Sequence, residues 1–272
     1  DLSKKLGHIY NKDQEFVNLV CDKAESNRRF AKYMGRPWCV NNEVSLEEFR
    51  DIFSGIDRII YKPVGGNCGK GVSVYDISED NIEDVYRELR DFPAGVVEQY
   101  LVQHPELSSL APDSVNTIRV VTISSKDFPV NDAGDHFDIA YAALRIGGGS
   151  SVVDNFHSGG MVTAVDLETG KVITNAVDMK GKVYRNHPVT EKKIQGFTIP
   201  AFNDVLDMAK AACGDLEGYL GWDIAVSENG PVLIEVNTKP AVALLQMPYV
   251  PKRKGMKYVM EKYLDICPED YE

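Results

Sequence analysis

The pattern of hydrophobic and polar positions divides the first third of the chain into three stretches. Residues 1–50 are polar and helical in pattern. Residues 57–76 contain two β-rich runs separated by a glycine-rich loop. Apolar residues then recur at helical spacing through residues 78–92, behind an Asp80/Glu83 pair that predicts a capped helix start.

The remainder of the chain alternates between apolar strands and one clear amphipathic helix. The helix is predicted over residues 202–213, and the C-terminus is predicted to be helical as well. Strands are predicted at residues 95–101, 114–124, 137–147 and 160–177 (the last with a Thr-Gly turn), and a hairpin at 221–237. Antiparallel strands grouped apart from the helices indicate an α+β fold class.

Composition narrows the class of protein. The chain has 272 residues and 43% hydrophobic content, which is enough for a sizeable core. Its net charge of −11 opposes binding to the phosphate backbone of nucleic acid. The five cysteines are scattered and form no CxxC pair, which indicates reduced thiols and a cytoplasmic location. No apolar run reaches transmembrane length, and no signal-peptide pattern opens the chain.

The first candidate for chemistry is the stretch YKPVGGNCGKGVSVY, residues 61–75. It is not a Walker A loop, because the spacing before Gly69-Lys70 is too short and Gly71 replaces the hydroxyl residue. The third glycine of a dinucleotide fingerprint is missing, and no HRD or DFG follows to support a protein kinase. Two interpretations remain. The loop is a flap whose backbone N–H groups close over phosphates above Lys62, or it is a hairpin turn with an exposed lysine.

The second candidate is GWDIAVSENGPVLIEVNTKP, residues 221–240. A three-residue loop at 228–230 would place Asp223 opposite Glu235, with Asn237 on the same face. A two-residue turn would instead put the two carboxylates on opposite faces. Neighbouring carboxylates repel unless a cation joins them, and few hard oxygen ligands suit Mg²⁺ that phosphates also hold. The alternative is an edge hairpin with two solvated acids.

The chain resembles the ATP-grasp superfamily in three motifs, which occur in the order YKPVGGNCGKGV, VVEQYL and GWDIAV…VLIEVN. The run QHPEL…SVNTIRVVT…LRIG…VDNFHSGG is similar to its sugar-transfer-associated branch. The resemblance implies an ATP-grasp fold with two α+β lobes that clamp the nucleotide. It divides the chain into a helical segment (1–54), a lid lobe with the glycine loop (55–103) and a catalytic lobe (104–272). The α/β domain that usually precedes these lobes is expected to be absent or much reduced.

The same resemblance implies how ATP and its metal are bound. Lys62 would contact the α- and β-phosphates, Glu98 the adenine amino group and Glu106 the ribose hydroxyls. Arg28, in preference to Arg29, stands where many relatives place a phosphate-binding lysine. The full set of residues implied to bind ATP is Arg28, Lys62, Gly65, Gly66, Gly69, Lys70, Gly71, Val72, Glu98, Gln99, Tyr100, Leu101 and Glu106. Asp223, Glu235 and Asn237 match the ligands of Mg²⁺.

Arg119 and Arg145 lie within otherwise apolar strands, so each guanidinium must find an anion, either a structural carboxylate or a ligand. The resemblance places them, with Lys62, in catalysis beside the γ-phosphate and the acceptor. The residues expected to contact the acceptor are Asn116, Asn155, His157, Ser158, Gly159 and Lys239. For the 154–160 loop, the alternative interpretation is a plain turn with a surface histidine.

The leading hypothesis is an ATP- and Mg²⁺-dependent carboxylate–amine ligase that acts through an acylphosphate. Its partners would be small-molecule carboxylate and amine substrates, such as a sugar acid and an amino acid in polysaccharide biosynthesis, and the chain could be a homo-oligomer. One alternative is an ATP-grasp kinase that phosphorylates a hydroxyl or carboxylate and stops there. A further alternative is a nucleotide-binding module without turnover, which would have less need of three convergent metal ligands.

Overall fold

The computed structural model describes residues 2–64, 71–125, 136–149, 159–214, 216–261 and 263. The chain divides into two compact units, a small unit of Asn18–Val102 and a large unit of Asp1–Val17 with Gln103–Glu272. Among the described residues, no helix is both long and apolar enough to span a membrane.

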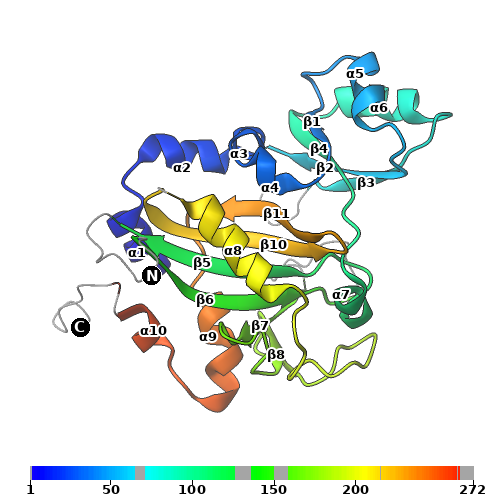
Figure 1. Cartoon of the computed structure of the whole chain (residues 1–272). Coiled ribbons are helices and arrows are strands. Elements are labelled where there is room, and N and C mark those ends of the chain that lie inside the picture. Colours follow the sequence, from blue (N-terminus) through cyan, green and yellow to red (C-terminus); the bar gives the residue numbers. More distant parts are fainter. Residues whose placement is uncertain are drawn as a thin grey trace. The chain divides into compact units, whose positions relative to one another are not determined.

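The small unit contains a four-stranded antiparallel sheet in the order β1-β4-β2-β3 (Figure 1). Its strands are β1 (Trp38–Val40), β2 (Arg58–Pro63), β3 (Ser73–Asp76) and β4 (Gly95–Gln99). Strand β1 corrects the sequence analysis, which expected residues 1–54 to be a separate helical segment. Because β1 pairs with β4, much of that segment belongs to the small unit.

Helices cover both faces of this sheet. On one face, α5 (Leu46–Ile52) and α6 (Ile82–Arg90) bury a core that includes Phe49, Ile59, Tyr61, Leu89 and Val97. On the other face, α3 (Lys23–Arg29) places Ala24 against Val40 and Val96. The short helix α4 (Ala31–Met34) follows α3, and α2 (Gln14–Cys21) precedes it.

The predicted start of α6 is wrong in detail. Its N-cap is Asn81, which makes no side-chain capping bond, so Asp80 and Glu83 do not form a capping pair. Glu83 instead forms ion pairs with Arg50 on the neighbouring helix α5, at 3.0 Å, and with Arg87 one turn further along α6. Charged partners thus replace the capping bond that the sequence pattern suggested.

The large unit contains a seven-stranded antiparallel sheet in the order β11-β10-β5-β6-β7-β8-β9. Its strands are β5 (Thr117–Ser124), β6 (Phe137–Ile146), β7 (Met161–Val165), β8 (Ala176–Asp178), β9 (Val183–Tyr184), β10 (Gly218–Ser227) and β11 (Gly230–Asn237). The predicted strand–turn–strand at 160–177 is only half right. After β7, Lys171 and Val172 form isolated bridges, and the next strand is β8.

Helices lie on both faces of the large sheet. Helix α8 (Phe202–Cys213), predicted with these bounds, packs across β5, β10 and β11 (Figure 1). Its Cys213 Sγ lies 3.8 Å from Ser124 Oγ. The opposite face of β5 carries Val121, which packs in a core with α1 (Leu2–Tyr10), α9 (Ala243–Gln246) and α10 (Lys257–Glu261). Helix α7 (Pro105–Leu110) and the 3₁₀ helix η2 (Met247–Lys252) complete the described helices of this unit.

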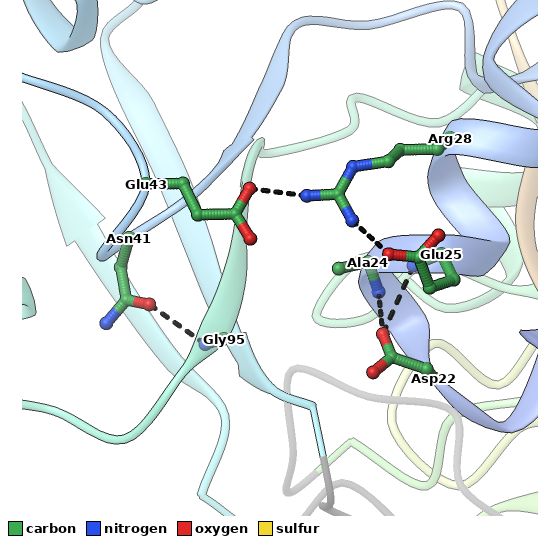
Figure 2. Close-up of polar contacts among 7 residues, drawn as sticks. All are labelled: Asp22, Ala24, Glu25, Arg28, Asn41, Glu43 and Gly95. Atoms are coloured by element: carbon green, nitrogen blue, oxygen red, sulfur yellow. Dashed lines mark hydrogen bonds and ion pairs between the residues drawn. The ribbon is translucent and has the colours of Figure 1, made fainter.

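Asn41 joins three parts of the small unit. Its side chain is buried, and its Nδ2 donates to Leu89 O at 2.6 Å and to Pro93 O at 3.0 Å. Its Oδ1 accepts from Gly95 N at 2.9 Å (Figure 2). One amide thus connects the end of β1 to the end of α6 and the start of β4.

We predict that Asn41→Ala lowers the free energy of unfolding of the small unit by about 2–3 kcal/mol, because Gly95 N loses its acceptor and the carbonyls of Leu89 and Pro93 each lose one donor. Urea unfolding at neutral pH measures the change. Asn42→Ala is the matched control, since Asn42 is exposed, and its effect should stay within about 0.5 kcal/mol. Equal stability of Asn41→Ala and Asn42→Ala would contradict the structural role of Asn41.

Candidate functional site

The β10–β11 hairpin places Asp223 opposite Glu235, as predicted, but by a different route. Ser227 pairs with Gly230, so the loop has two residues and the predicted three-residue loop is wrong. The register then shifts between Ile224, which pairs with Leu233, and Asp223. This β-bulge adds one residue to β11 and returns Glu235 to the face of Asp223. The turn and the bulge together give the pairing that the sequence analysis derived from the loop alone.

The buried carboxylate of Asp223 binds two guanidinium groups. Arg119, its partner across the β5–β10 pairing, donates from Nε to Oδ1 at 2.5 Å and from Nη2 to Oδ2 at 2.8 Å. Arg145 donates from Nη1 to Oδ2 at 2.7 Å. Asn237 Nδ2 lies 3.4 Å from the same oxygen. The anion expected for Arg119 is therefore a structural carboxylate, and Arg145 shares it.

The sheet face that carries this cluster is apolar at one end and charged at the other. Arg119 and Val121 are two residues apart on β5, so their side chains lie on the same face of the strand. Val121 belongs to the core that packs with α1, α9 and α10. Gly221 makes room for the arginine, because a Cβ there would lie 3.1 Å from Arg119 Cδ and 2.7 Å from Pro240 Cβ. A side chain at position 221 would therefore clash with Pro240 and crowd the side chain of Arg119.

The small unit holds a second buried carboxylate with two cations. Glu98 Oε2 accepts from Arg36 Nη2 at 2.5 Å, from Arg36 Nε at 3.1 Å and from Lys62 Nζ at 2.7 Å. Glu98 Oε1 accepts from Asn27 Nδ2 at 3.0 Å. The side chains of Arg36 and Glu98 are each 3% exposed, whereas that of Lys62 is 17% exposed.

The strand pairing explains why these groups meet. Glu98 lies opposite Ile60, and Lys62 lies two residues further along β2, so both side chains share one face. Helix α3 covers that face and contributes Asn27, while Arg36 lies two residues before the first residue of β1, the strand that pairs with β4.

The cations hold both carboxylates ionised. Burial alone would raise the pKa of Asp223, but the charges of Arg119 and Arg145 and their hydrogen bonds lower it below its ordinary value. Burial would likewise raise the pKa of Glu98, and the charges of Arg36 and Lys62, with hydrogen bonds from Lys62 and Asn27, lower it. The Glu98 cluster has one negative and two positive charges, so it carries a net positive charge. In the large unit, the two arginines face both Asp223 and the neighbouring Glu235.

A comparison with protein families identifies the fold. The family model described as "Sugar-transfer associated ATP-grasp" matches residues 2–260 of the chain. The chain belongs to this family. Its α+β fold is therefore an ATP-grasp fold, as the sequence motifs indicated. No curated protein matches the chain.

Solved structures of several ATP-grasp enzymes are distantly similar to this ATP-grasp chain. D-cycloserine synthetase DcsG is 12% identical with a TM-score of 0.49, over 84% of this chain and 65% of that one. N5-carboxyaminoimidazole synthetase from Staphylococcus aureus, solved with ADP, is 11% identical with a TM-score of 0.47, over 82% and 46%. The ligase PsnB, solved with a precursor peptide and AMPPNP, is 13% identical with a TM-score of 0.45, over 87% and 54%. The chain thus spans about half to two thirds of the length of these structures.

The residues that ATP-grasp chemistry would assign to Mg²⁺ fit that ion by donor type. Asp223, Glu235 and Asn237 offer carboxylate and amide oxygens from one face of the hairpin, and Mg²⁺ prefers such donors. Among the described side chains, Asp223 Oδ1 accepts one hydrogen bond, from Arg119, so it retains a lone pair. A half-turn of the Asn237 amide would present its oxygen in place of its nitrogen. Among the described residues, no group of three or more His, Cys, Asp or Glu side chains is arranged to hold a metal ion, so the set here consists of two carboxylates and one amide.

The other residues predicted to bind nucleotide differ in their exposure and in the partners that they already have. Arg28 is exposed and forms ion pairs with Glu25 and Glu43 (Figure 2). Tyr100 N donates to Arg58 O at 2.9 Å, so that N–H group is already used. The remaining described residues are Gly71, with φ of +75°, and Val72 after the glycine loop, Gln99 and Leu101 around the end of β4, and Glu106 in the first turn of α7. Their roles stay predictions, and Gly65, Gly66, Gly69 and Lys70 lie outside the described residues.

Of the residues predicted to contact the acceptor, Asn116, Gly159 and Lys239 lie within the described part of the chain. Asn116 is fully buried; its Nδ2 donates to Gln103 Oε1 at 2.9 Å and to Leu107 O at 3.1 Å, and its Oδ1 accepts from Gly147 N at 3.3 Å. These bonds give Asn116 a structural role. Lys239 is exposed, as is Gly159, which has φ of +97°. Asn155, His157 and Ser158 lie outside the described residues.

Sequence reasoning missed Asn27 and Arg36. Glu98 lies 71 residues from Asn27 and 62 residues from Arg36, so no local spacing indicated their convergence. Arg36 does sit beside the apolar run Trp38–Val40, and recognising that run as a strand would have placed the guanidinium at the edge of a sheet.

We predict an acid-dependent loss of stability in the large unit that depends on Asp223. A carboxylate whose pKa is lower in the folded state stabilises it fully above the unfolded pKa, near 4, and this stability is lost as the pH falls through the folded pKa. Asp223→Asn should cost about 3 kcal/mol at pH 7, because two buried guanidiniums lose their anion. It should also flatten the stability–pH profile below pH 4 by up to about 1.4 kcal/mol per pH unit.

Urea unfolding between pH 2.5 and 7, followed by the fluorescence of Trp222 in a Trp38→Phe background, measures both effects. Asp207→Asn is the matched control, since Asp207 is an exposed carboxylate on α8. A profile of Asp223→Asn parallel to that of the control would contradict the assigned electrostatics.

Proposed function

We propose that the chain is an ATP- and Mg²⁺-dependent ligase that joins a carboxylate to an amine through an acylphosphate. Membership of the ATP-grasp family supports the use of ATP. One observation carries the proposal: Asp223, Glu235 and Asn237 converge on one sheet face beside two arginines. A bound Mg²⁺ would neutralise part of the phosphate charge at these oxygens.

The arginines suit phosphoryl transfer because of how they share Asp223. Arg119 binds both oxygens of the carboxylate and is almost fully buried, so it is a fixed partner. Arg145 binds Oδ2 of Asp223 through its Nη1, and its side chain is more exposed than that of Arg119, at 13%. Since Arg119 alone can neutralise Asp223, Arg145 can turn toward the γ-phosphate and stabilise charge that develops during transfer.

The proposed reaction has two steps. An oxygen of the substrate carboxylate attacks the γ-phosphorus of ATP, which forms an acylphosphate and releases ADP. The nitrogen of an amine then attacks the acyl carbon, forms the C–N bond and displaces inorganic phosphate. That phosphate retains the oxygen from the carboxylate, and the amine loses a proton to solvent or to a basic group.

For substrates, we propose a sugar acid or other small carboxylate and an amino acid or other small amine. The support is the description of the family, which associates it with sugar transfer.

The test of the reaction is ATP turnover against panels of carboxylates, with and without amines. With an ¹⁸O-labelled carboxylate, the ligase should release inorganic phosphate that carries one ¹⁸O atom, and mass spectrometry should find an amide product. A stable phosphate ester formed without any amine would indicate the kinase alternative. Tight ATP binding with no turnover against any acceptor would indicate a binding module.

We predict that Asp223→Asn and Glu235→Gln each lower kcat on the order of 100-fold or more, because charge at the transferring phosphoryl group loses its stabilisation. Glu228→Gln, at the turn of the same hairpin, is the matched control and should leave kcat unchanged. Full turnover by Glu235→Gln would refute the assigned metal site.

A further inference from the structure

The cluster around Glu98 contains a cation that the sequence motifs do not account for. Arg36 donates two hydrogen bonds to Glu98 Oε2, and its Nη1 donates to Met34 O at 2.9 Å, so its guanidinium is fixed at both ends. Lys62 binds the same oxygen through its ammonium at 2.7 Å. Of the two cations on this carboxylate, Arg36 is therefore the buried and anchored one, and Lys62 is the more exposed one.

These contacts create a constraint on Lys62. For its ammonium to bind a phosphate, it must leave Glu98 or share itself between the two anions. If it left a buried carboxylate with no other cation, the cost would approach that of an isolated buried charge. With Arg36 in place, Glu98 keeps a charged partner and a hydrogen bond from Asn27 when the lysine moves.

We propose that Arg36 is a positioning residue for nucleotide binding: it neutralises Glu98 so that Lys62 is free to engage the triphosphate. This inference rests on the proposed function, in which Lys62 binds the phosphates of ATP. It assigns Glu98 a different role from the predicted adenine contact, since Glu98 holds Lys62 ready in the small unit before nucleotide arrives.

The proposal makes the effect of Arg36 depend on the charge of Glu98. In Arg36→Met, Lys62 becomes the remaining cation on a buried carboxylate, and phosphate must compete with that ion pair. In Arg36→Met/Glu98→Gln, position 98 has no charge to neutralise, so Lys62 is available again. A packing defect from the loss of Arg36 would weaken binding by the same factor in both backgrounds.

The experiment is calorimetric titration of the full chain with Mg²⁺-ATP, and with inorganic tripolyphosphate as a probe of the phosphate contacts alone. The proteins are the wild type, Arg36→Met, Glu98→Gln and the double variant. We expect Arg36→Met to raise both dissociation constants about tenfold or more in the wild-type background, and less than about threefold in the Glu98→Gln background.

The matched control is Arg50→Met, since Arg50 is an exposed arginine of the same unit that pairs with Glu83, and it should bind as the wild type does. Equal losses from Arg36→Met in the two backgrounds would overturn the inference, as would no loss at all. A wild-type chain that binds neither ligand would overturn the proposed function together with the inference. A wild-type chain that binds both, with equal losses, would overturn the inference alone.

Discussion

Each unit of this protein depends on a buried carboxylate that is bound by two cations. Burying an ionised carboxylate without a cation beside it would cost several kcal/mol of folding free energy, or the group would become protonated. Arg36 and Lys62 prevent this for Glu98, and Arg119 and Arg145 prevent it for Asp223. In both clusters the first cation is anchored by more than one bond, while the second is more exposed. The same arrangement thus keeps the anion charged and leaves one cation able to bind an additional anion.

Backbone geometry brings these charges together. In the large unit, the register shift beside Asp223 sets Glu235 on the correct face, and the missing side chain of Gly221 leaves space for Arg119. In the small unit, the pairing of the short edge strand β1 with β4 brings Arg36, two residues before β1, to Glu98. An acidic chain with a net charge of −11 can therefore present a locally positive cluster around Glu98 in the small unit.

The sequence was sufficient to predict features that depend on the local pattern of apolar and polar residues. The bounds of α8 followed from apolar spacing, and an arginine inside the apolar strand β5 required an anion. The pairing of Asp223 with Glu235 was predicted from a wrong loop, because a bulge in an apolar run leaves no mark in the pattern. The Arg36–Glu98 pair could not be predicted, since its partners are 62 residues apart and each looked like part of a polar segment or a strand end.

The central claim is that Lys62 is the cation that moves, while Arg36 stays on Glu98. A crystal structure of the chain with Mg²⁺ and a non-hydrolysable ATP analogue tests this most directly. The account predicts Lys62 Nζ within about 3.2 Å of a phosphate oxygen and the Arg36–Glu98 ion pair intact. A bound triphosphate with Lys62 still on Glu98, or with Arg36 displaced from it, would contradict the account.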